Sequence, residues 1–594
     1  MNPNKPSILG YNWQQKNFDS RLAKTIMQRF ELSEILSNLI AMRGVALDDV
    51  ENFLLPKIKT SLPDPFALND MAKAVDFVID CILKNKKITI FADYDVDGAT
   101  SSALLKRFFS DIEFKAEIYI PDRILEGYGP NSEALLALKK SGTDLVITLD
   151  CGTVAFKPLL DAKEAGLDVI VIDHHLGVLE KPSSIAIINP NCLDEKFPHK
   201  NLCAAGVTFL FVVAVNKKLR ELNFYAAKKE PNLLNLLDLV ALGTVCDVMP
   251  LTGLNRAFVD AGLKILQQRK NLGLRQICDL AGLDEKPNSY HLGFIIGPRI
   301  NAGGRIGKSN LGATILSSDN EEEILKISQE LELLNKQRKD IEAVALEEAV
   351  NALEKGENGF LKTDSVIFAT SKNWHQGVIG IVASRLKDLY GKPVAVIAVD
   401  EKNNKGKASC RSISGIDFGG EILNARLEGL LLEGGGHAAA GGFSILADKI
   451  KDLHKFFCQK MGAKVDEILL QKNANYDIAL DLVQVNFDLI NDLSKLEPFG
   501  VGNMRPKFLL RDVIKIRANL IGQTGDHVSC IFSSKTSVGF SGNLQAIAFR
   551  CGKTKLGEIL LDPKIKNMSL IGTIEVNNYM QSQRLQIIIE DLIL

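Results

Sequence analysis

Three apolar segments of the chain end in acidic residues or histidines, and this pattern constrains the fold more than any other. ITIFADYDVDG (88–98), DLVITLDCG (144–152) and DVIVIDHHLG (168–177) each run from an apolar stretch into polar residues. Helix-length segments separate them, and such alternation is typical of a parallel α/β sheet. Because the carboxyl ends of parallel strands share one edge of a sheet, where ligands bind, we expect these polar ends to meet in space.

The acidic residues at this edge require a counter-charge. Two like charges about 4 Å apart cost roughly 4 kcal/mol at an effective dielectric near 20. A fourth segment, LVALGTVCDVMPL (239–251), adds a helix-like run that ends at Asp247. Aspartate oxygens with imidazole and no thiolate suit Mn²⁺ or Mg²⁺ better than zinc. Cys151 and Cys246 each stand beside a candidate ligand, and we expect both to face away from the site.

Each of these motifs also has a simpler interpretation. A lone aspartate after a strand is most often a turn or helix-cap residue. Asp97 and Gly98 could form only a turn, Asp93 could only orient its neighbours, and paired histidines occur by chance. Taken together on one edge of a sheet, the motifs favour a site for two divalent ions, an arrangement that supports phosphoester hydrolysis.

The composition fits a large multidomain protein whose net charge is close to zero. The 594 residues suggest three or four domains, and the net charge of −1 means that a polynucleotide partner would need local basic patches. The ten cysteines include no CxxC pair, which favours a reducing compartment. MNPNKPSILG has no signal pattern, and apolar runs such as FLFVVAV (209–215) are shorter than a membrane span. We therefore expect a soluble cytoplasmic protein.

The chain divides into five expected regions, with an α/β fold class overall. A long helix over 319–355, which has no Gly or Pro, is predicted to link a parallel-sheet domain to a second α/β domain, and a small β-barrel is predicted at the C-terminus. The expected regions are an N-terminal helical region (1–78), the parallel-sheet domain (79–255), a helical connector (256–355), the second α/β domain (356–465) and the barrel (466–594).

The motifs resemble those of a known group of enzymes. DYDVDG, the strand end at Asp150, DHH and GTVCDVMPL, in this order, resemble the four motifs of the DHH phosphoesterase superfamily. LEPFGVGNMRPKF (496–508) resembles the start of the oligonucleotide-binding (OB) domain of the RecJ family of single-strand-specific exonucleases. Four further segments resemble the accessory-domain motifs of that family: GPRINAGGRIG (297–307), NWHQGVIGIVASRL (373–386), SCRS (409–412) and GGGHAAAGGF (434–443).

This resemblance implies a 5′→3′ exonuclease that releases 5′ mononucleotides from single-stranded DNA, uses Mn²⁺ or Mg²⁺, and acts in DNA repair and recombination. It places His175 near the scissile phosphate and Asp93 as an additional catalytic member. Many superfamily members have a histidine where this chain has Phe91, which leaves the shell of one metal open. The implied metal ligands are Asp95, Asp97, Asp150, His174 and Asp247.

The second α/β domain contains several of the predicted substrate-binding residues. GGGHAAAGGF, with five glycines in ten residues, is either an interdomain turn or a backbone cradle for phosphate. Arg411 is a candidate for a terminal 5′ phosphate, because a guanidinium fork matches phosphate geometry. His437 could bond a phosphate or be a buried structural histidine. The predicted substrate-binding residues are Arg123, Arg299, Asn301, Arg305, Ser409, Arg411, Gly435, Gly436 and His437.

Other residues keep two interpretations. We favour packing for Trp374, and His375 could either pack or contact substrate. The basic residues of 505–517 are either a solvated face or a track for a DNA backbone. Three phenylalanines of the C-terminal region could be base platforms, although at strand spacing such residues are more often core: Phe508, Phe532 and Phe549.

Two other functions remain open on sequence grounds. A DHH-family phosphodiesterase of short oligonucleotides or cyclic dinucleotides would keep the chemistry, but such relatives are typically shorter and lack a large C-terminal barrel. A non-catalytic DNA-binding scaffold would have lost metal ligands that this chain retains. The resemblance also implies contact with a single-strand-binding protein and a RecQ-type helicase. We expect no membrane partner and a monomer.

Overall fold

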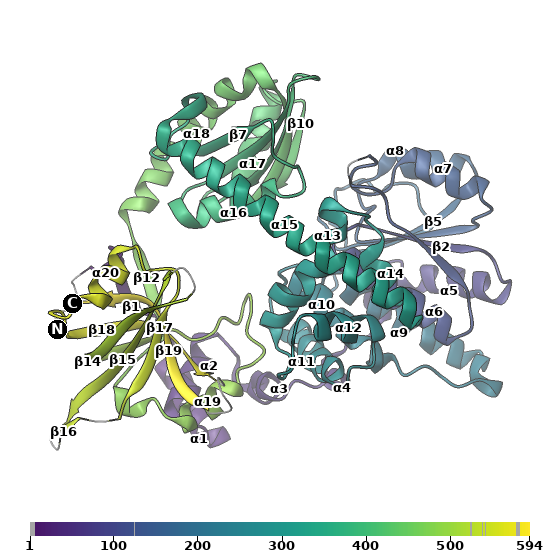
Figure 1. Cartoon of the computed structure of the whole chain (residues 1–594). Coiled ribbons are helices and arrows are strands. Elements are labelled where there is room, and N and C mark those ends of the chain that lie inside the picture. Colours follow the sequence, from purple (N-terminus) through teal and green to yellow (C-terminus); the bar gives the residue numbers. More distant parts are fainter. Residues whose placement is uncertain (1–5, 124, 523–524, 537–538, 541, 578–582) are drawn as a thin grey trace. The chain divides into compact units, whose positions relative to one another are not determined.

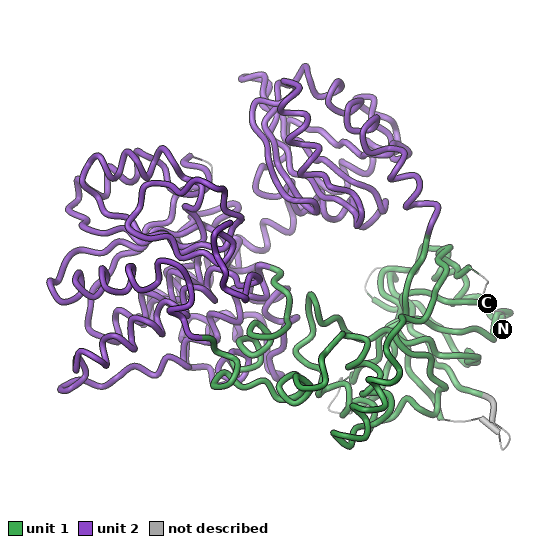
Figure 2. The backbone as a smooth tube through the Cα atoms, turned by 180° about the vertical axis from the view of Figure 1, so that it is seen from behind, with its two compact units in different colours: residues 1–63, 248–261, 472–594 green, residues 64–247, 262–471 purple. Residues whose placement is uncertain are grey.

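The computed structural model describes residues 6–123, 125–522, 525–536, 539–540, 542–577 and 583–594 (Figure 1). The chain forms two compact units (Figure 2). One unit contains residues 64–247 and 262–471, and the other contains residues 1–63, 248–261 and 472–594. Among the described residues, none of the helices combines the length and apolarity needed to cross a bilayer.

The larger unit contains the expected parallel sheet, in the order β3-β2-β4-β5-β6. The two central strands, β2 and β4, are buried along their whole length, because helices cover both faces of the sheet (Figure 1). The strands are β2 (Ile88–Ala92), β3 (Ala116–Tyr119), β4 (Leu145–Leu149), β5 (Asp168–Ile172) and β6 (Ala186–Ile188).

The helices around this sheet follow the alternation of the strand residues. Phe91, Val146 and Val169 share one face and pack with residues of α7 and α8. Helix α6 contacts strand β2 and helices α9 and α10. The helices are α5 (Met71–Leu83), α6 (Val96–Asp111), α7 (Ser132–Lys140), α8 (Phe156–Glu164), α9 (Ala204–Glu221) and α10 (Leu237–Cys246).

The region after α10 is helical, as expected, and its long helix is confirmed as α15 (Glu321–Lys355). Asn320 caps its first turn, and Gly356 ends it in the left-handed conformation (φ 69°). The segment 297–307 lies within the expected helical connector; its motif GPRINAGGRIG by itself suggested a tight loop, but it is mostly the helix α13. The other helices here are α11 (Gly253–Gln267), α12 (Leu272–Leu280), the π-helix η5 (His291–Ile296), α13 (Gly297–Ile306) and α14 (Leu311–Ser317).

The second α/β domain of this unit has a mixed sheet in the order β10-β11-β9-β8-β7, in which only β7 and β8 are parallel. Trp374 packs into its core, as favoured, and donates a hydrogen bond to Glu348 of α15. The elements are β7 (Ile367–Ser371), β8 (Val394–Asp400), β9 (Lys405–Arg411), β10 (Glu433–His437), β11 (Ala440–Leu446), α16 (Ile379–Tyr390), α17 (Phe418–Leu427) and α18 (Ile450–Leu470).

The smaller unit contains the C-terminal barrel, closed by pairing of β14 with β15. The glycine-free run Phe508–Ile521 forms β14, which bends at register shifts and pairs with β13, β15 and β18. The main elements are β13 (Ile478–Leu480), α19 (Phe487–Ser494), β14, β15 (His527–Thr536), β16 (Gly539–Phe540), β17 (Leu544–Ala548), α20 (Lys555–Leu561), β18 (Asn567–Asn577) and β19 (Arg584–Ile593).

The N-terminal helices belong to the same unit as the barrel, although we expected them as a separate region. Side chains of α1 and α2 share one hydrophobic core with the barrel strands. The short strand β1 (Asn12–Gln15) also pairs in parallel with β12 (Asn473–Tyr476). The remaining helices are α1 (Ser20–Phe30), α2 (Glu34–Met42), α3 (Val50–Leu54) and α4 (Ile58–Ser61).

Candidate active site

The register of the parallel sheet aligns the residues that follow its strands. Ala92 pairs with Leu149, and Leu149 pairs with Ile172. The next residue of each strand is therefore Asp93, Asp150 or Asp173, and all three lie at one edge. Their backbone amides continue the ladder, since Asp93 donates to Leu149 at 3.2 Å and Asp150 donates to Ile172 at 3.0 Å. The sheet thus brings together acids that are 80 residues apart in the sequence.

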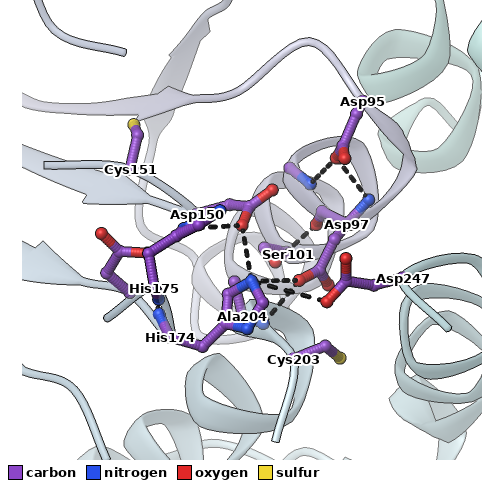
Figure 3. A network of polar contacts seen from close by, with 12 residues as sticks. Asp95, Asp97, Ser101, Asp150, Cys151, His174, His175, Cys203, Ala204 and Asp247 are labelled. Carbon is purple, nitrogen blue, oxygen red and sulfur yellow. Dashed lines mark hydrogen bonds and ion pairs between the residues drawn. The ribbon is translucent and has the colours of Figure 1, made fainter. Parts of the chain in front are cut away.

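Two helix N-termini organise the acids of the DYDVDG segment. Asp95 caps α6, and its Oδ1 accepts hydrogen bonds from the amides of Asp97 and Gly98. Asp97 accepts hydrogen bonds from the amides of Ala204 and Ala205 at the start of α9, at 2.5 and 2.9 Å. The carboxylate of Asp97 therefore faces the positive end of a second helix (Figure 3).

Three groups of side chains could each hold a divalent cation. The ligand atoms of each group lie within 4.8 Å of one another, and the groups are Asp93–Asp95–Asp150, Asp97–His174–Asp247 and Asp150–His174–His175. His174 Nε2 lies 3.2 Å from Asp150 Oδ1 and 3.5 Å from Asp247 Oδ2 (Figure 3). The structure therefore brings all seven predicted metal and catalytic residues to one place.

Burial and like charge raise the pKa of the buried acids. Burial and the charge of Asp95 raise the pKa of Asp97 to about 7. Burial, Asp97 and Asp95 raise the pKa of Asp247 to about 9. The same causes hold the pKa values of Asp93 and Asp150 well above their ordinary range. The site is thus short of positive charge.

Buried carboxylate oxygens without hydrogen-bond donors mark where a cation could bind. Asp93 Oδ1, Asp150 Oδ1 and Asp247 Oδ2 are buried and have no hydrogen-bond donor. Buried carboxylate oxygens are normally paired or coordinate metals. The donor set is oxygen and imidazole, because Cys151 and Cys246 direct their thiols to the backbone carbonyls of Leu149 and Leu292. These residues fit Mn²⁺ or Mg²⁺.

Phe91 supplies no ligand at this site. It is fully buried and stacks on Tyr119, with ring centroids 5.3 Å apart. Asp93, two residues later, is in contact distance of Asp95 and Asp150. We therefore expect Asp93 to complete the shell in which many superfamily members use a histidine.

Asp173 lies at the same sheet edge, and the sequence analysis gave it no role. Its Oδ1 accepts a hydrogen bond from His175 Nδ1 at 2.8 Å, and its Oδ2 accepts one from Thr153 Oγ1 at 2.7 Å. Burial opposes the charge of Asp173, but the bond from His175 prevails and lowers its pKa. In turn, burial opposes the charge of His175, and Asp173 raises its pKa to about 9. The sequence signal that could have pointed to Asp173 is its place as the first residue of the DHH motif.

His174 has the opposite electrostatic environment. Burial and the neighbouring charge of His175 lower the pKa of His174 to about 4. A neutral imidazole is the form that binds a metal ion. The pKa values of the two adjacent histidines are therefore shifted in opposite directions.

Tyr128 is a second residue that the sequence analysis missed. Its hydroxyl lies 3.3 Å from His175 Nδ1 and donates to the carbonyl of Asp150 at 3.2 Å. The rings of Tyr128 and His175 meet edge to face with centroids 5.8 Å apart. Gly127 and Gly129 flank Tyr128 with φ of 84° and 75°, which are left-handed conformations that favour glycine. The GYG sequence could therefore have pointed to a tight turn at Tyr128.

The predicted phosphate-binding residues divide into two sets. Burial, followed by the charges of Arg123, Arg338 and Arg411, lowers the pKa of Arg305 to about 10, so these guanidinium groups are close. Asn301, one turn before Arg305, has a buried Oδ1 without a donor. Arg299 differs, because it forms an ion pair with Glu332 at 2.5 Å and donates to Ile295.

The glycine-rich motif of the second domain is a β-hairpin with its turn at residues 438–439, within one domain and not between domains. Its use as a phosphate cradle stays a prediction. β10 and β11 pair from Glu433–Ser444 to His437–Ala440. A Cβ at Gly436 would lie 2.4 Å from the Cα of Gly441, whereas Gly435 has open space. Ser409 and Arg411 lie on the adjacent strand β9, where Arg411 donates to Ser409 Oγ at 3.3 Å. His437 is exposed at the end of β10.

The basic run of the C-terminal region is partly structural. Lys515 is buried and donates to the carbonyls of Leu560 and Asp562, where α20 ends. Lys507 pairs with Glu590. Arg511 and Arg517 are exposed on β14. Of the three phenylalanines considered as base platforms, Phe508 and Phe532 are fully buried and Phe549 is 53% exposed.

The close packing of α10 against α6 gives a direct test of the metal site. A Cβ at Gly243 would lie 2.7 Å from both Asp97 Oδ1 and Thr100 Oγ1. We expect Gly243→Ala to displace Asp97, to cost about 1–3 kcal/mol of stability through overpacking, and to reduce metal-dependent cleavage at least about tenfold. Gly542→Ala is the control, because nothing lies within 4 Å of its Cβ. Unchanged cleavage and melting temperature in Gly243→Ala would show that this contact is not needed.

Three family models match separate parts of the chain. Residues 87–244 match the DHH family, N-terminal domain, residues 363–463 match the DHHA1 domain, and residues 476–591 match the RecJ OB domain. The matches include the parallel sheet, the mixed sheet and the barrel, in this order.

Several relatives match this chain over most of its length. The chain is 33% identical over 545 residues to the single-stranded-DNA-specific exonuclease RecJ of Haemophilus influenzae, covering 90% of this chain and 92% of that protein. It is 32% identical over 571 residues to the protein of the same name from Escherichia coli, covering 95% and 96%. A crystal structure of RecJ in complex with Mn²⁺ from Thermus thermophilus superposes with a TM-score of 0.77 at 25% identity, covering 98% of this chain and 79% of that one.

Proposed function

Because the chain belongs to the RecJ family of single-stranded-DNA-specific exonucleases, we propose that it hydrolyses single-stranded DNA from the 5′ end and releases 5′ mononucleotides. The observation that carries the catalytic part is the cluster of buried carboxylates around His174, three of which have oxygens without donors. A scaffold that had lost its chemistry would not need to keep this charge buried. The enzyme is a metal-dependent exodeoxyribonuclease.

The residues of the cluster have distinct roles in this proposal. Asp95, Asp97, Asp150, His174 and Asp247 would hold two divalent ions, with Asp93 completing one shell. Bound ions would lower the pKa of the attacking water and offset charge on the phosphate and the leaving oxygen. His175 bonds to Asp173 through Nδ1, has its Nε2 3.4 Å from the Tyr128 hydroxyl, and carries a proton at neutral pH. Tyr128 packs against that ring and fixes its orientation.

The cluster of arginines supports the proposed polarity. The charges of Arg123 and Arg411 act on Arg305, and the family resemblance places the terminal 5′ phosphate at these arginines. Arg299 is paired with Glu332, so we assign it to holding α13 against α15. A pocket for a terminal phosphate beside the ions would admit one nucleotide at a time from the 5′ end.

Arg411 gives a test of this pocket. Arg411→Lys keeps the charge but loses the planar fork, so we expect the preference for a 5′-phosphorylated strand over a 5′-hydroxyl strand to fall roughly tenfold. The measurement compares initial rates on the two strands with saturating Mn²⁺. Arg426→Lys, an exposed arginine in the last turn of α17, is the matched control. An unchanged preference in Arg411→Lys would remove Arg411 from the pocket.

The overall proposal is tested with three 5′-phosphorylated substrates: a single-stranded DNA, its duplex and the same sequence as RNA, each labelled at either end. We expect mononucleotides from the 5′ end of the single-stranded DNA alone, and only with Mn²⁺ or Mg²⁺. Hydrolysis of dinucleotides without degradation of the polymer would favour the short-oligonucleotide phosphodiesterase instead. Degradation from the 3′ end would contradict the assigned polarity.

Partners beyond DNA stay predictions from the family. We propose that the chain acts as a monomer in repair and recombination, together with a single-strand-binding protein and a RecQ-type helicase. Light scattering and pull-down with the purified partners test these points separately from the nuclease assay.

A further inference from the structure

The middle of the long helix α15 buries three polar side chains. Leu331, Asn335, Arg338, Glu342 and Ala345 recur at intervals of three or four residues, so they form one buried face of the helix. Asn335, Arg338 and Glu342 are at most 9% exposed, although apolar residues precede and follow them on this face. Charged side chains are almost never buried to this degree unless they are paired. Their partners therefore indicate the role of this part of the helix.

Arg338 is the centre of this polar group. Its Nε and Nη2 donate to Asn335 Oδ1 at 3.3 and 3.0 Å, and its Nη1 donates to Glu342 Oε2 at 2.7 Å. The other carboxylate oxygen of Glu342 accepts a hydrogen bond from Arg385 Nε of α16 at 3.3 Å. Glu342 thus bonds to arginines of two helices. Charge-assisted hydrogen bonds of this kind are stronger than neutral ones, and here they link α16 to α15.

The start of α16 contacts the predicted phosphate-binding residues. The carbonyl of Gly377, two residues before α16, accepts a hydrogen bond from Arg305 Nη1 at 3.0 Å. A Cβ at Gly380, in the first turn of α16, would lie 3.0 Å from Ser409 Oγ and 3.3 Å from Arg411 Nη2. The position of α16 on α15 therefore affects where both Arg305 and Arg411 lie.

Glu342 also balances charge among these arginines. Within the part of the chain that the structure describes, it is the only acidic side chain paired with Arg338, and Arg305 bonds to a carbonyl and to no carboxylate. Burial, then the charges of Arg123 and Arg338, lower the pKa of Arg305, so these cations repel one another. An ionised Glu342 offsets part of that repulsion.

We propose that Glu342, held by Arg338 and bonded to Arg385, is a positioning residue for the 5′-phosphate pocket. It acts through α16, whose first turn contacts Arg411 and whose preceding loop binds Arg305. This inference rests on the proposed function, because it takes Arg305 and Arg411 as the groups that bind a terminal phosphate. It adds that their spacing depends on a buried carboxylate that bonds to neither of them.

Binding without cleavage tests this role. The full chain in EDTA is titrated with 3′-labelled dT20 that carries either a 5′ phosphate or a 5′ hydroxyl, and the ratio of the two dissociation constants measures the preference for the phosphate. Arg385→Gln removes the bond to Glu342 at a side chain that is 49% exposed, and it leaves Glu342 paired with Arg338. We expect this preference to fall at least about threefold, with unchanged affinity for the hydroxyl strand. Arg385→Lys keeps a cation for Glu342 and should retain most of the preference.

Glu342→Gln tests the same link from the other helix. It keeps the shape of the side chain and removes its charge, so we expect at least the same loss of preference. The double variant with Arg385→Gln should lose no more than Glu342→Gln alone, because both substitutions act on one bond. Glu354→Gln is the matched control, since Glu354 is an exposed glutamate of α15 that pairs with Lys362. If Glu342→Gln melts below the assay temperature, Arg385→Gln alone decides.

An unchanged preference in Arg385→Gln and Glu342→Gln would overturn the proposal. Equal losses on both strands would overturn it too, because a pocket for the terminal phosphate has no contact to lose at a hydroxyl end. A wild-type protein that prefers the phosphorylated strand but fails to degrade it with Mn²⁺ would contradict the proposed function instead, and the same ratio would still decide the positioning role.

Discussion

Asp150→Asn is expected to abolish metal-dependent cleavage and, at the same time, to make the metal-free protein more stable. Asp150 belongs to two of the three candidate cation groups, is 2% exposed, and has a buried Oδ1 without a donor. Loss of an outer partner of a metal ligand costs roughly 10–100-fold in activity or affinity, so loss of a ligand itself should cost more than about 100-fold. The measurement is the initial rate on 5′-labelled single-stranded DNA with Mn²⁺.

The stability effect follows from the charge balance of the same site. Burial and the charges of Asp95 and Asp97 raise the pKa of Asp150, so above its ordinary pKa this carboxyl destabilises the metal-free fold. An isosteric amide removes that cost, and we expect the unfolding free energy in EDTA to rise by about 1 kcal/mol or more at neutral pH. The stabilisation that Mn²⁺ gives to the wild type should be lost in the variant.

Asp340→Asn, an exposed position on α15, is the control and should change neither quantity. Full cleavage by Asp150→Asn in protein free of contaminating nuclease would rule out the assigned metal centre. A fall in both cleavage and EDTA stability would instead show that Asp150 is needed for packing and not for coordination.

Arg256→Ala is expected to unfold the smaller unit at a markedly lower temperature. Arg256 is 1% exposed, and its guanidinium donates to the backbone carbonyls of Phe53, Leu496 and Glu497 at 2.8, 3.0 and 2.6 Å. It also lies over the ring of Phe53, 4.1 Å from the centroid. Burial lowers its pKa only to about 10, so it remains charged at neutral pH.

The size of this effect comes from the groups that the substitution leaves behind. Each buried carbonyl that loses its donor costs about 1–3 kcal/mol, so we expect a loss of about 3 kcal/mol or more. For a unit of this size, that corresponds to a melting temperature lower by on the order of 10 °C. Arg256→Lys should lose most of the same stability, because one ammonium cannot reproduce the planar fork. Differential scanning calorimetry of the full chain measures both.

Arg21→Ala, an exposed arginine on α1 of the same unit, is the matched control. A melting profile of Arg256→Ala that matches this control would mean that water satisfies the carbonyls and that Arg256 does not hold the unit together.

The parallel sheet could be predicted because its signals are local. Strands β2, β4 and β5 are apolar runs interrupted by helices, and each ends at the point where the acidic residues begin. The long helix α15 could be predicted for the same reason, since 35 residues without Gly or Pro have no local alternative. The seven predicted metal and catalytic residues meet at the sheet edge because register follows from these strands, and their roles stay proposals.

The features that were missed depend on contacts between distant segments. The segment 297–307 suggested a tight loop inside a helical region, but it forms most of α13. Its glycines allow close packing, since a Cβ at Gly304 would lie 2.6 Å from the carbonyl oxygen of Tyr94. The hairpin of β10 and β11 likewise uses glycine for close approach between strands. When the segment that packs against it is unknown, a glycine-rich sequence suggests a turn.

The sequence by itself determined the order of strands and helices, the positions of the acids at strand ends and the donor types of the metal site, because each depends on neighbours within a few residues. Tertiary structure alone decided which charged groups are free. Arg299 forms an ion pair with Glu332, and Lys515 donates to a carbonyl at the end of α20. Asp173 accepts a hydrogen bond from His175. It also placed the N-terminal helices in the core of the barrel and left Phe549 exposed while burying Phe508 and Phe532. The physical reason is that charge pairing and burial depend on which two segments come into contact. The local sequence of one segment does not reveal the other.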